Sequence, residues 1–317
     1  MSIVLIISIA VAVVSVIVCV YLKLTRTRCT CKADLTGKTV IVTGANSGIG
    51  YFTALDFATR NARVILACRN MDKATEACSK IKEETGNKNI IAKHLELSSL
   101  KSVRKFADEI KKEEKRLHIL VNNAGVLGLP QIMTDEGLEY MYATNHFGPF
   151  LLTNLLLDLL KASAPSRIVN VSSVVNKMGR IDFGNLRAER AFNRQAIYFN
   201  SKLANILFTK ELARILKGTG VSANCLHPGS VNSGLLRNLP AVVREPLRLL
   251  AHFYFMTAEE GAQTTIHCAV SEKVEGISGI YFMGCKEADS SANRVSQDEG
   301  VARKLWEISE TYTGLTQ

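Results

Sequence analysis

Short apolar runs and longer amphipathic segments alternate along most of the chain. The apolar runs are rich in Val and Ile, which suits buried strands, and most are followed by a segment whose apolar residues have helical spacing. Predicted strands cover residues 38–42, 63–68, 90–95, 118–122, 166–172, 221–226 and 279–283. Predicted helices cover residues 51–60, 72–84, 100–115, 137–162 and 196–216. This alternation predicts the α/β class, with a single Rossmann-type doubly wound parallel sheet of about seven strands and helices on both faces.

Residues 3–22 form an apolar run without a charged side chain. About twenty such residues are long enough to cross a bilayer as a helix. A cleaved signal peptide fits less well, because the run is too long and no charged segment precedes it. Basic residues from Lys23 to Lys32 then come before the first acidic residue, Asp34, which predicts that this flank faces the cytosol.

The chain has 317 residues, of which 47% are apolar, and this is enough for one substantial α/β core. The predicted organisation is a transmembrane anchor over residues 1–22, a basic juxtamembrane linker over residues 23–36 and a catalytic domain over residues 37–317. We expect a single-pass membrane protein whose catalytic domain faces the cytosol, with the endoplasmic reticulum as the favoured membrane.

The formal net charge is +10, which raises the question of nucleic-acid binding. The basic residues, however, form no single arm with interleaved aromatic side chains. In residues 101–116 acidic residues interrupt the basic ones, as on a solvated helix face. We therefore predict no nucleic-acid partner and attribute the excess charge to an anionic membrane surface and a polyphosphate cofactor.

Eight cysteines are present, but no Cys-x-x-Cys pair or His/Cys grouping has the spacing of a zinc site. The six histidines are scattered as well, so the sequence predicts free thiols and no metal. Cys29 and Cys31 lie beside the predicted anchor, and reversible acylation there is a hypothesis. Metabolic labelling with a palmitate analogue tests it, because the absence of label at both positions would exclude it.

A glycine-rich segment, Thr43-Gly44-Ala45-Asn46-Ser47-Gly48-Ile49-Gly50, separates the first predicted strand from the first predicted helix. Such a turn places backbone N–H groups and a helix N-terminus against a pyrophosphate. Glycines also end strands for purely structural reasons, so the segment alone does not establish a nucleotide site.

Tyr198 and Lys202 lie one turn apart on a predicted helix and therefore project from one face. Hydride transfer to or from an alcohol carbon requires that a proton move as well, and a tyrosine with a pKa of about 10 is a poor base at neutral pH. A neighbouring lysine cation favours the tyrosinate, so we assign Tyr198 as the general acid/base and Lys202 as the group that lowers its pKa. Without the other motifs, a surface contact on the helix would be the favoured explanation of the pair.

The order and spacing of these motifs resemble those of the short-chain dehydrogenase/reductase family. The segments that carry this resemblance are Thr43 to Gly50, Asn122-Asn123-Ala124-Gly125, Asn145, Ser172-Ser173, Tyr198 to Lys202 and Pro228-Gly229. The resemblance covers roughly residues 36–312. Several details point to the membrane-bound retinol dehydrogenase-like subgroup: the long stretch between Ser173 and Tyr198, the run 201–205, and the late segments 260–264 and 305–307.

The resemblance implies roles for individual residues. Ser173 would hydrogen-bond the substrate oxygen, Lys202 would hold the nicotinamide ribose, and Asn145 would bind a water in a proton relay. Spacing alone leaves Ser172 as an alternative to Ser173. The predicted cofactor-binding residues are Gly44, Asn46, Ser47, Gly48, Ile49, Gly50, Arg69, Lys73, Glu96, Leu97, Asn123, Ala124, Gly125, Tyr198, Lys202, Pro228, Gly229 and Val231.

The end of the second predicted strand bears on the choice of cofactor. An NAD enzyme places a carboxylate there for the ribose hydroxyls, whereas an NADP enzyme places a cation for the phosphate. Here the strand is followed by Arg69, with Lys73 nearby, so NADP(H) is the predicted cofactor. We interpret Asp72 as a helix-start residue. Glu96 replaces the subgroup's usual aspartate, so the residue that would contact adenine keeps its charge but has a longer reach.

Residues 235–256 form an apolar stretch that contains three arginines. The resemblance implies a mobile flap over the substrate, and an interfacial segment or ordinary core packing are alternatives. Together with the anchor, this favours a hydrophobic substrate such as retinol or retinal. A steroid or fatty-aldehyde carbonyl reductase is an alternative, and a membrane-tethered NADP(H)-binding scaffold is one from another class. The resemblance also allows a homodimer.

Overall fold

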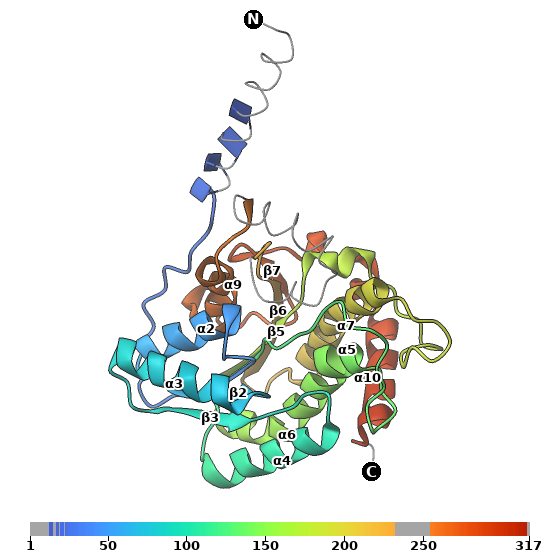
Figure 1. The fold of residues 1–317 in the computed structure, drawn as a ribbon, viewed down its shortest axis with the longest axis horizontal. Helices are drawn as coiled ribbons and strands as arrows, with labels where there is room; N and C mark the ends of the chain where they lie inside the picture. The colour runs from blue at the N-terminus through green and yellow to red at the C-terminus, as the bar shows by residue number, and fades with distance from the viewer. Residues whose placement is uncertain (1–12, 15–16, 19, 22, 232–253, 316–317) are drawn as a thin grey trace, which may run out of the picture.

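The structure is a computed structural model that describes residues 13–14, 17–18, 20–21, 23–231 and 254–315 (Figure 1). Most of the predicted anchor and most of the predicted flap over residues 235–256 lie outside the described residues. Within these ranges, no helix is both long enough and apolar enough to cross a membrane.

The described part of the chain builds one eight-stranded sheet in the order β3-β2-β1-β4-β5-β6-β7-β8. The strands are β1 (Thr39–Thr43), β2 (Arg63–Cys68), β3 (Ile90–His94), β4 (Ile119–Asn122), β5 (Ser166–Val171), β6 (Val221–His227), β7 (Tyr281–Met283) and β8 (Lys286–Glu287). The first seven are parallel, which confirms the predicted doubly wound sheet, and β8 pairs antiparallel with β7. The prediction missed β8, because its two exposed residues carry no apolar pattern.

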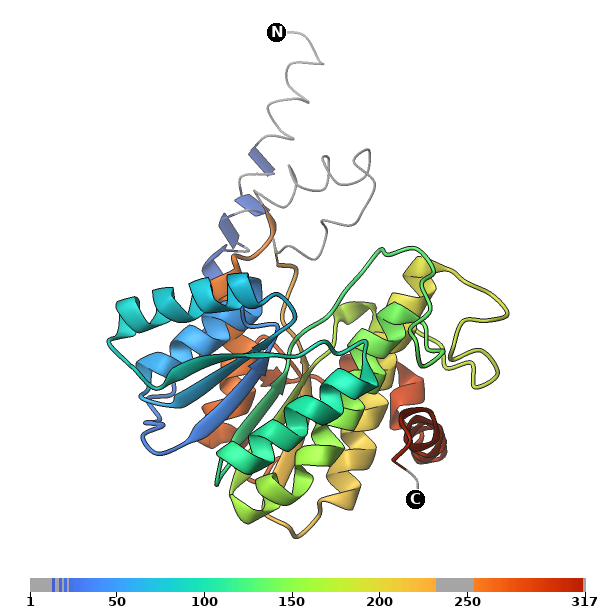
Figure 2. The same cartoon turned by 60° about the horizontal axis from the view of Figure 1, so that its bottom comes forward.

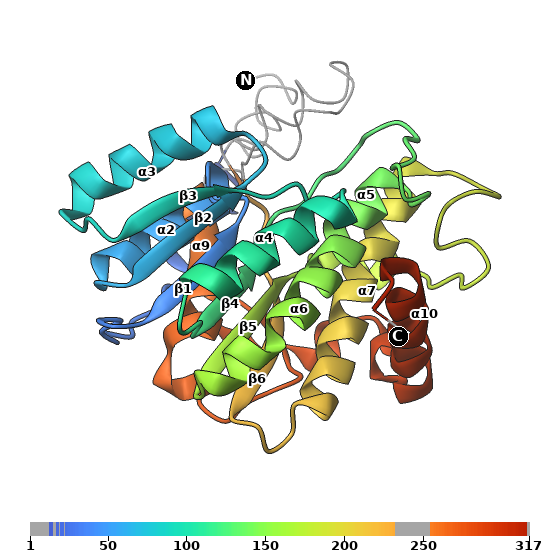
Figure 3. The ribbon, with the colours of Figure 1, turned by 90° about the horizontal axis from the view of Figure 1, so that it is seen from below.

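The main helices are α2 (Gly48–Thr59), α3 (Met71–Thr85), α4 (Leu100–Glu113), α5 (Tyr140–Tyr142), α6 (Gly148–Ala162), α7 (Arg194–Ile215), α9 (Ala258–Val270) and α10 (Glu299–Thr313). Figures 2 and 3 show α4, α6 and α7 on one face of the sheet and α2 and α3 on the other. Since side chains alternate along a strand, Ile41 packs with the first group, whereas Val40 and Val42 pack with α2, α3 and α9. The sheet therefore separates two cores.

The predicted helix over residues 137–162 is divided in the structure. It begins at Tyr140, where Glu139 caps the first turn, and residues Ala143–Phe147 form a π-helical turn before α6. The Gly148 N–H bonds to the Ala143 carbonyl, five residues earlier. Pro149 has no N–H and cannot bond to the Asn145 carbonyl, so an ordinary α-helical register fails at this point. Asn145 therefore lies in an irregular turn rather than in a continuous helix.

Candidate active site

A cavity of about 760 Å³ lies at the carboxyl ends of the parallel strands. This is the edge at which open α/β sheets bind ligands. Every residue that the sequence assigned to the cofactor lines this cavity, and so does Ser173. The alternation of strands and helices brings these residues together from segments far apart in the chain.

The glycine turn between β1 and α2 approaches the turn after β4 very closely. A Cβ added at Gly50 would lie 2.5 Å from both Asn123 Nδ2 and Gly44 O. The Thr43 hydroxyl oxygen accepts hydrogen bonds from the backbone N–H groups of Asn123 at 2.9 Å and Ala124 at 3.0 Å. Asn123 Nδ2 in turn donates to the Thr43 carbonyl at 2.8 Å. These contacts fix a cradle at the N-terminus of α2 that fits a pyrophosphate.

We expect Gly50→Ala to weaken NADPH binding by about 100-fold, because the added methyl group must displace backbone on which the cradle is built. Isothermal titration with NADPH measures the effect. Gly300→Ala is the control, because its Cβ would meet only Asp298 Oδ1, at 3.2 Å, outside the cavity. An unchanged dissociation constant in folded Gly50→Ala would contradict the assignment of the cradle.

Ser173 follows β5, and Tyr198 and Lys202 project from α7 into the same end of the cavity. The Ser173 side chain lies close enough to the Tyr198 hydroxyl to act on the pKa of the tyrosine, which it lowers. Ser172 points elsewhere, since its hydroxyl donates to the Lys202 carbonyl at 2.6 Å. The geometry thus distinguishes the two serines and places Ser173 beside Tyr198.

Burial dominates the acid–base properties of this end of the cavity. It raises the pKa of Tyr198 to about 12, although the Ser173 side chain acts in the opposite direction. Burial also lowers the pKa of Lys202 to about 8. The Lys202 ammonium lies 5.6 Å from the centre of the Tyr198 ring and donates to the Val171 carbonyl at 3.0 Å. The expectation that Lys202 lowers the pKa of Tyr198 left out this desolvation, which has the largest effect on the tyrosine in this structure.

Asn145 lies behind the cavity and is not one of the residues that line it. Its Nδ2 donates to the Val126 carbonyl at 3.0 Å and to the Ser201 hydroxyl at 3.1 Å, and its Oδ1 accepts from the Val126 N–H at 2.8 Å. A Cβ on Gly125 would lie 3.4 Å from both Asn145 Oδ1 and Lys202 Nζ. Asn145 therefore ties the turn after β4 to α7, and its role with a water stays a prediction.

The far end of the cavity carries the predicted phosphate-binding cation. Arg69 Nε lies 3.3 Å from Glu96 Oε2, and Arg69 Nη1 donates to the Tyr140 hydroxyl. Glu96 Oε1 also accepts from the Ser98 hydroxyl at 2.7 Å. Both oxygens of the Glu96 carboxylate therefore contact neighbouring side chains. The contact of Glu96 with adenine stays a prediction. Lys73 lies in the first turn of α3, where Asn70 accepts its backbone N–H at 2.9 Å.

Sequence analysis missed three residues that shape the cavity: Thr43, Tyr140 and His227. Thr43 was part of the glycine motif, but the sequence does not show that its hydroxyl accepts hydrogen bonds from two backbone N–H groups. The Tyr140 hydroxyl contacts Arg69, which lies 71 positions earlier in the sequence. A contact between residues so far apart produces no periodic pattern in the sequence. His227 lines the cavity at the end of β6, and burial lowers its pKa to about 4.

Within the described ranges, no group of three or more His, Cys, Asp or Glu side chains could hold a metal ion. The donor set instead consists of backbone N–H groups, hydroxyls and the cations Arg69, Lys73 and Lys202. These groups suit a ligand with phosphates at one end and a redox-active ring near Tyr198 at the other.

Comparison with known proteins identifies relatives of the whole fold. Residues 38–242 match the short chain dehydrogenase family. Retinol dehydrogenase 14 of Homo sapiens is 48% identical over 294 residues, which cover 88% of this chain and 87% of that protein. An uncharacterised protein from Mycobacterium paratuberculosis has a crystal structure with a TM-score of 0.71 and 31% identity, over 89% of this chain and 95% of that one.

A short chain dehydrogenase from Shigella flexneri, complexed with NADP, has a TM-score of 0.62 and 25% identity, over 80% of this chain and 98% of that one. The family match covers most of the sheet, and the match to the human enzyme covers most of both proteins. The chain belongs to the short-chain dehydrogenase/reductase family and to its retinol dehydrogenase-like subgroup.

Proposed function

We propose that this protein is an NADP(H)-dependent oxidoreductase that interconverts retinol and retinal, or similar hydrophobic alcohols and aldehydes. One observation carries the proposal: a single cavity holds the glycine cradle, Arg69 and the group Ser173, Tyr198 and Lys202. The name of the human relative supports a retinoid substrate, and the NADP complex of the bacterial relative supports the cofactor.

When bound, NADPH would supply the hydride for the carbonyl carbon and would itself be oxidised to NADP⁺. In this scheme Ser173 donates a hydrogen bond to the carbonyl oxygen, and Tyr198 gives that oxygen its phenolic proton, so that the alcohol forms. The Lys202 ammonium stabilises the tyrosinate that remains until a proton from solvent restores the phenol. A raised pKa keeps Tyr198 protonated at neutral pH, which suits the reduction of a carbonyl.

The preference for NADP(H) is assigned to Arg69, with Lys73 in support. We expect Arg69→Asp to raise the KM for NADPH by about 100-fold while it leaves the KM for NADH nearly unchanged, because only NADPH carries the additional phosphate. Initial-rate kinetics with both cofactors measure this. Lys80→Asp on the exposed side of α3 is the matched control. Equal changes in both KM values would refute the assignment.

The substrate is tested with a panel of carbonyls: all-trans-retinal, a steroid ketone and a long-chain aldehyde. The purified protein in detergent or liposomes oxidises NADPH with each compound in turn. We expect the highest kcat/KM with retinal. A clear preference for the steroid or the aldehyde would keep the chemistry and replace the substrate class.

We further propose the three-part organisation: an anchor over residues 1–22, a linker over residues 23–36 and a catalytic domain on the cytosolic side of the endoplasmic reticulum. The charge-free run 3–22 and the basic residues that follow support it. Protease added to the outside of sealed microsomes should digest the catalytic domain of this protein. Full protection until detergent is added would contradict this orientation.

A further inference from the structure

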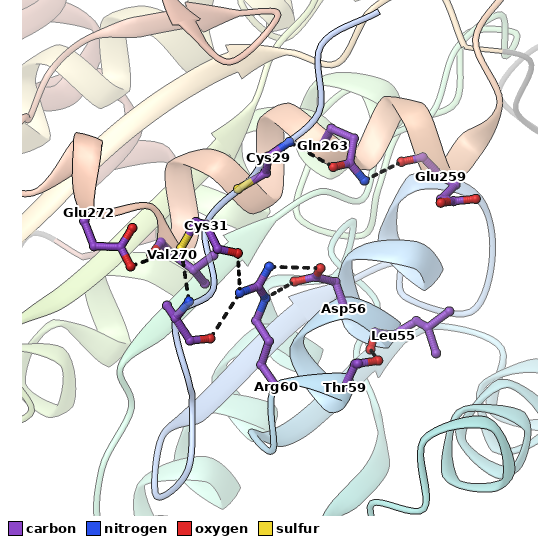
Figure 4. A network of polar contacts seen from close by, with 11 residues as sticks. Cys29, Cys31, Leu55, Asp56, Thr59, Arg60, Glu259, Gln263, Val270 and Glu272 are labelled. Atoms are coloured by element: carbon purple, nitrogen blue, oxygen red, sulfur yellow. Dashed lines mark hydrogen bonds and ion pairs between the residues drawn. The ribbon is translucent and has the colours of Figure 1, made fainter.

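Residues 26–36, which we call the N-terminal strap, run across the outer surface of α9 and α2 (Figures 1 and 4). The strap has no regular secondary structure of its own. The Cys29 N–H donates to Gln263 Oε1 on α9 at 3.1 Å. At the other end, Arg60 Nη1 donates to the carbonyls of Cys31 at 2.9 Å and Ala33 at 3.1 Å. The strap is thus fastened to both helices.

Arg26 makes the most buried ionic contact of the strap. Its Nη1 lies 2.5 Å from Glu260 Oε2, and its Nη2 donates to the Phe255 carbonyl at 3.0 Å. Only 11% of the Arg26 side chain and 16% of the Glu260 side chain are exposed. By contrast, the neighbouring pair Arg28 and Glu259 is 3.6 Å apart, with 63% and 54% exposure. Solvent screens the second pair far more than the first.

The carboxylate that Arg26 contacts also begins helix α9. Glu260 Oε2 accepts the Thr257 N–H at 2.7 Å, and the Thr257 hydroxyl accepts the Glu260 N–H at 3.2 Å. These two bonds form a capping box. Arg26 thus shares one oxygen with the cap and bonds the chain two residues before it, so it holds the first turn of α9 from outside.

The first turn of α9 also contacts two walls of the cofactor cavity. A Cβ on Gly261 would lie 2.4 Å from Val231 Cγ2 and 3.3 Å from Ile49 Cγ1, and both residues line the cavity. Just before the helix, the Met256 N–H bonds to the Ser230 carbonyl at 2.8 Å. A Cβ on Gly229 would lie 2.3 Å from Met256 Sδ. A small movement of this turn would therefore displace the cavity wall at residues 229–231.

We propose that Arg26 is a positioning residue for cofactor binding, which acts through Glu260 and the first turn of α9 on Val231 and Ile49. The inference rests on the proposed NADP(H) site. The linker would then stabilise the wall of the cavity as well as connect the predicted anchor to the catalytic domain. The segment that precedes the catalytic domain would then help to set its affinity for the cofactor.

The test is equilibrium binding of NADPH to the full-length chain in detergent, with the melting temperature measured alongside. We expect Arg26→Ala to raise the dissociation constant by about tenfold, equivalent to ~1.4 kcal/mol, with kcat at saturating NADPH nearly unchanged. Arg26→Lys keeps the charge but not the two-pronged contact and should recover part of the affinity. Arg28→Ala should bind NADPH as the unaltered chain does.

Two further variants separate positioning from general stability. Arg60→Ala frees the strap at its far end, away from the cavity, and should lower the melting temperature without a matching loss of affinity. Glu260→Gln keeps the capping oxygen but removes the charge, and its effect should not add to that of Arg26→Ala, because both remove one interaction.

Wild-type NADPH affinity in folded Arg26→Ala would overturn the inference. So would an equal loss of affinity in Arg60→Ala and Arg26→Ala, since the strap would then act only through stability. Failure of the unaltered chain to bind NADPH is a separate outcome, and it would overturn the proposed function together with this inference.

Discussion

Tyr198→Phe is expected to lower kcat for NADPH-dependent carbonyl reduction by about 10³-fold, within the usual range for the loss of a general acid. The variant removes one oxygen from a side chain that is 6% exposed and keeps the ring, so packing should be preserved. The developing alkoxide would then have no phenolic proton to accept. Single-turnover measurements at saturating NADPH isolate this chemical step from binding.

The matched control is Tyr51→Phe, which removes a hydroxyl from α2 outside the cavity and should leave kcat unchanged. Tyr198→Phe should bind NADPH with little loss of affinity. If it kept more than about a tenth of the activity, Tyr198 would not be the proton donor. If it kept both NADPH binding and the normal role in cells, the protein would act as a cofactor-binding scaffold.

Lys202→Met is expected to abolish most turnover without lowering the melting temperature at pH 7. Burial lowers the pKa of Lys202 from 10.5 to about 8, so folding disfavours this charge. The unfolded chain holds the proton more tightly, and this contribution to stability therefore rises with pH between about 8 and 10.5. Methionine removes the buried charge, while Asn205 Nδ2 remains 3.4 Å from the Val171 carbonyl.

Lys210→Met is the control with the opposite signature. Lys210 lies on the same helix and contacts Asp289 Oδ2 at 2.6 Å, outside the cavity, so its loss should lower the melting temperature and spare activity. In the unaltered enzyme, kcat for reduction should also fall above about pH 8, as Lys202 loses its proton. A strongly destabilised Lys202→Met would instead indicate a structural role for this lysine.

The sequence predicted the seven parallel strands well, because short buried runs of Val and Ile in an α/β fold are mostly strands of the central sheet. It missed the π-helical turn at residues 143–147, since all five residues are buried and the residue pattern does not reveal hydrogen-bond register. Pro149 was the available signal. The β7–β8 hairpin depends on Gly284 and Cys285, both with positive φ, rather than on hydrophobic pattern.

The candidate site was predictable to the extent that its residues follow strands, because the ends of parallel strands meet at one edge. Contacts made by side chains between distant segments were not predictable. Arg26 meets Glu260 across 234 positions, and Arg69 meets Tyr140 across 71. The direction of the Tyr198 pKa shift was also missed, because a sequence shows the neighbouring lysine but not the depth of burial.

The most direct test of the proposed chemistry traces the hydride itself. The purified protein receives all-trans-retinal and NADPH that carries deuterium in place of the transferable hydride, and the products are examined by mass spectrometry. The proposed function predicts retinol with one deuterium on its carbinol carbon, formed in step with NADP⁺ and at a far lower rate by Tyr198→Phe. Unlabelled retinol, or NADPH binding without any retinol, would contradict it.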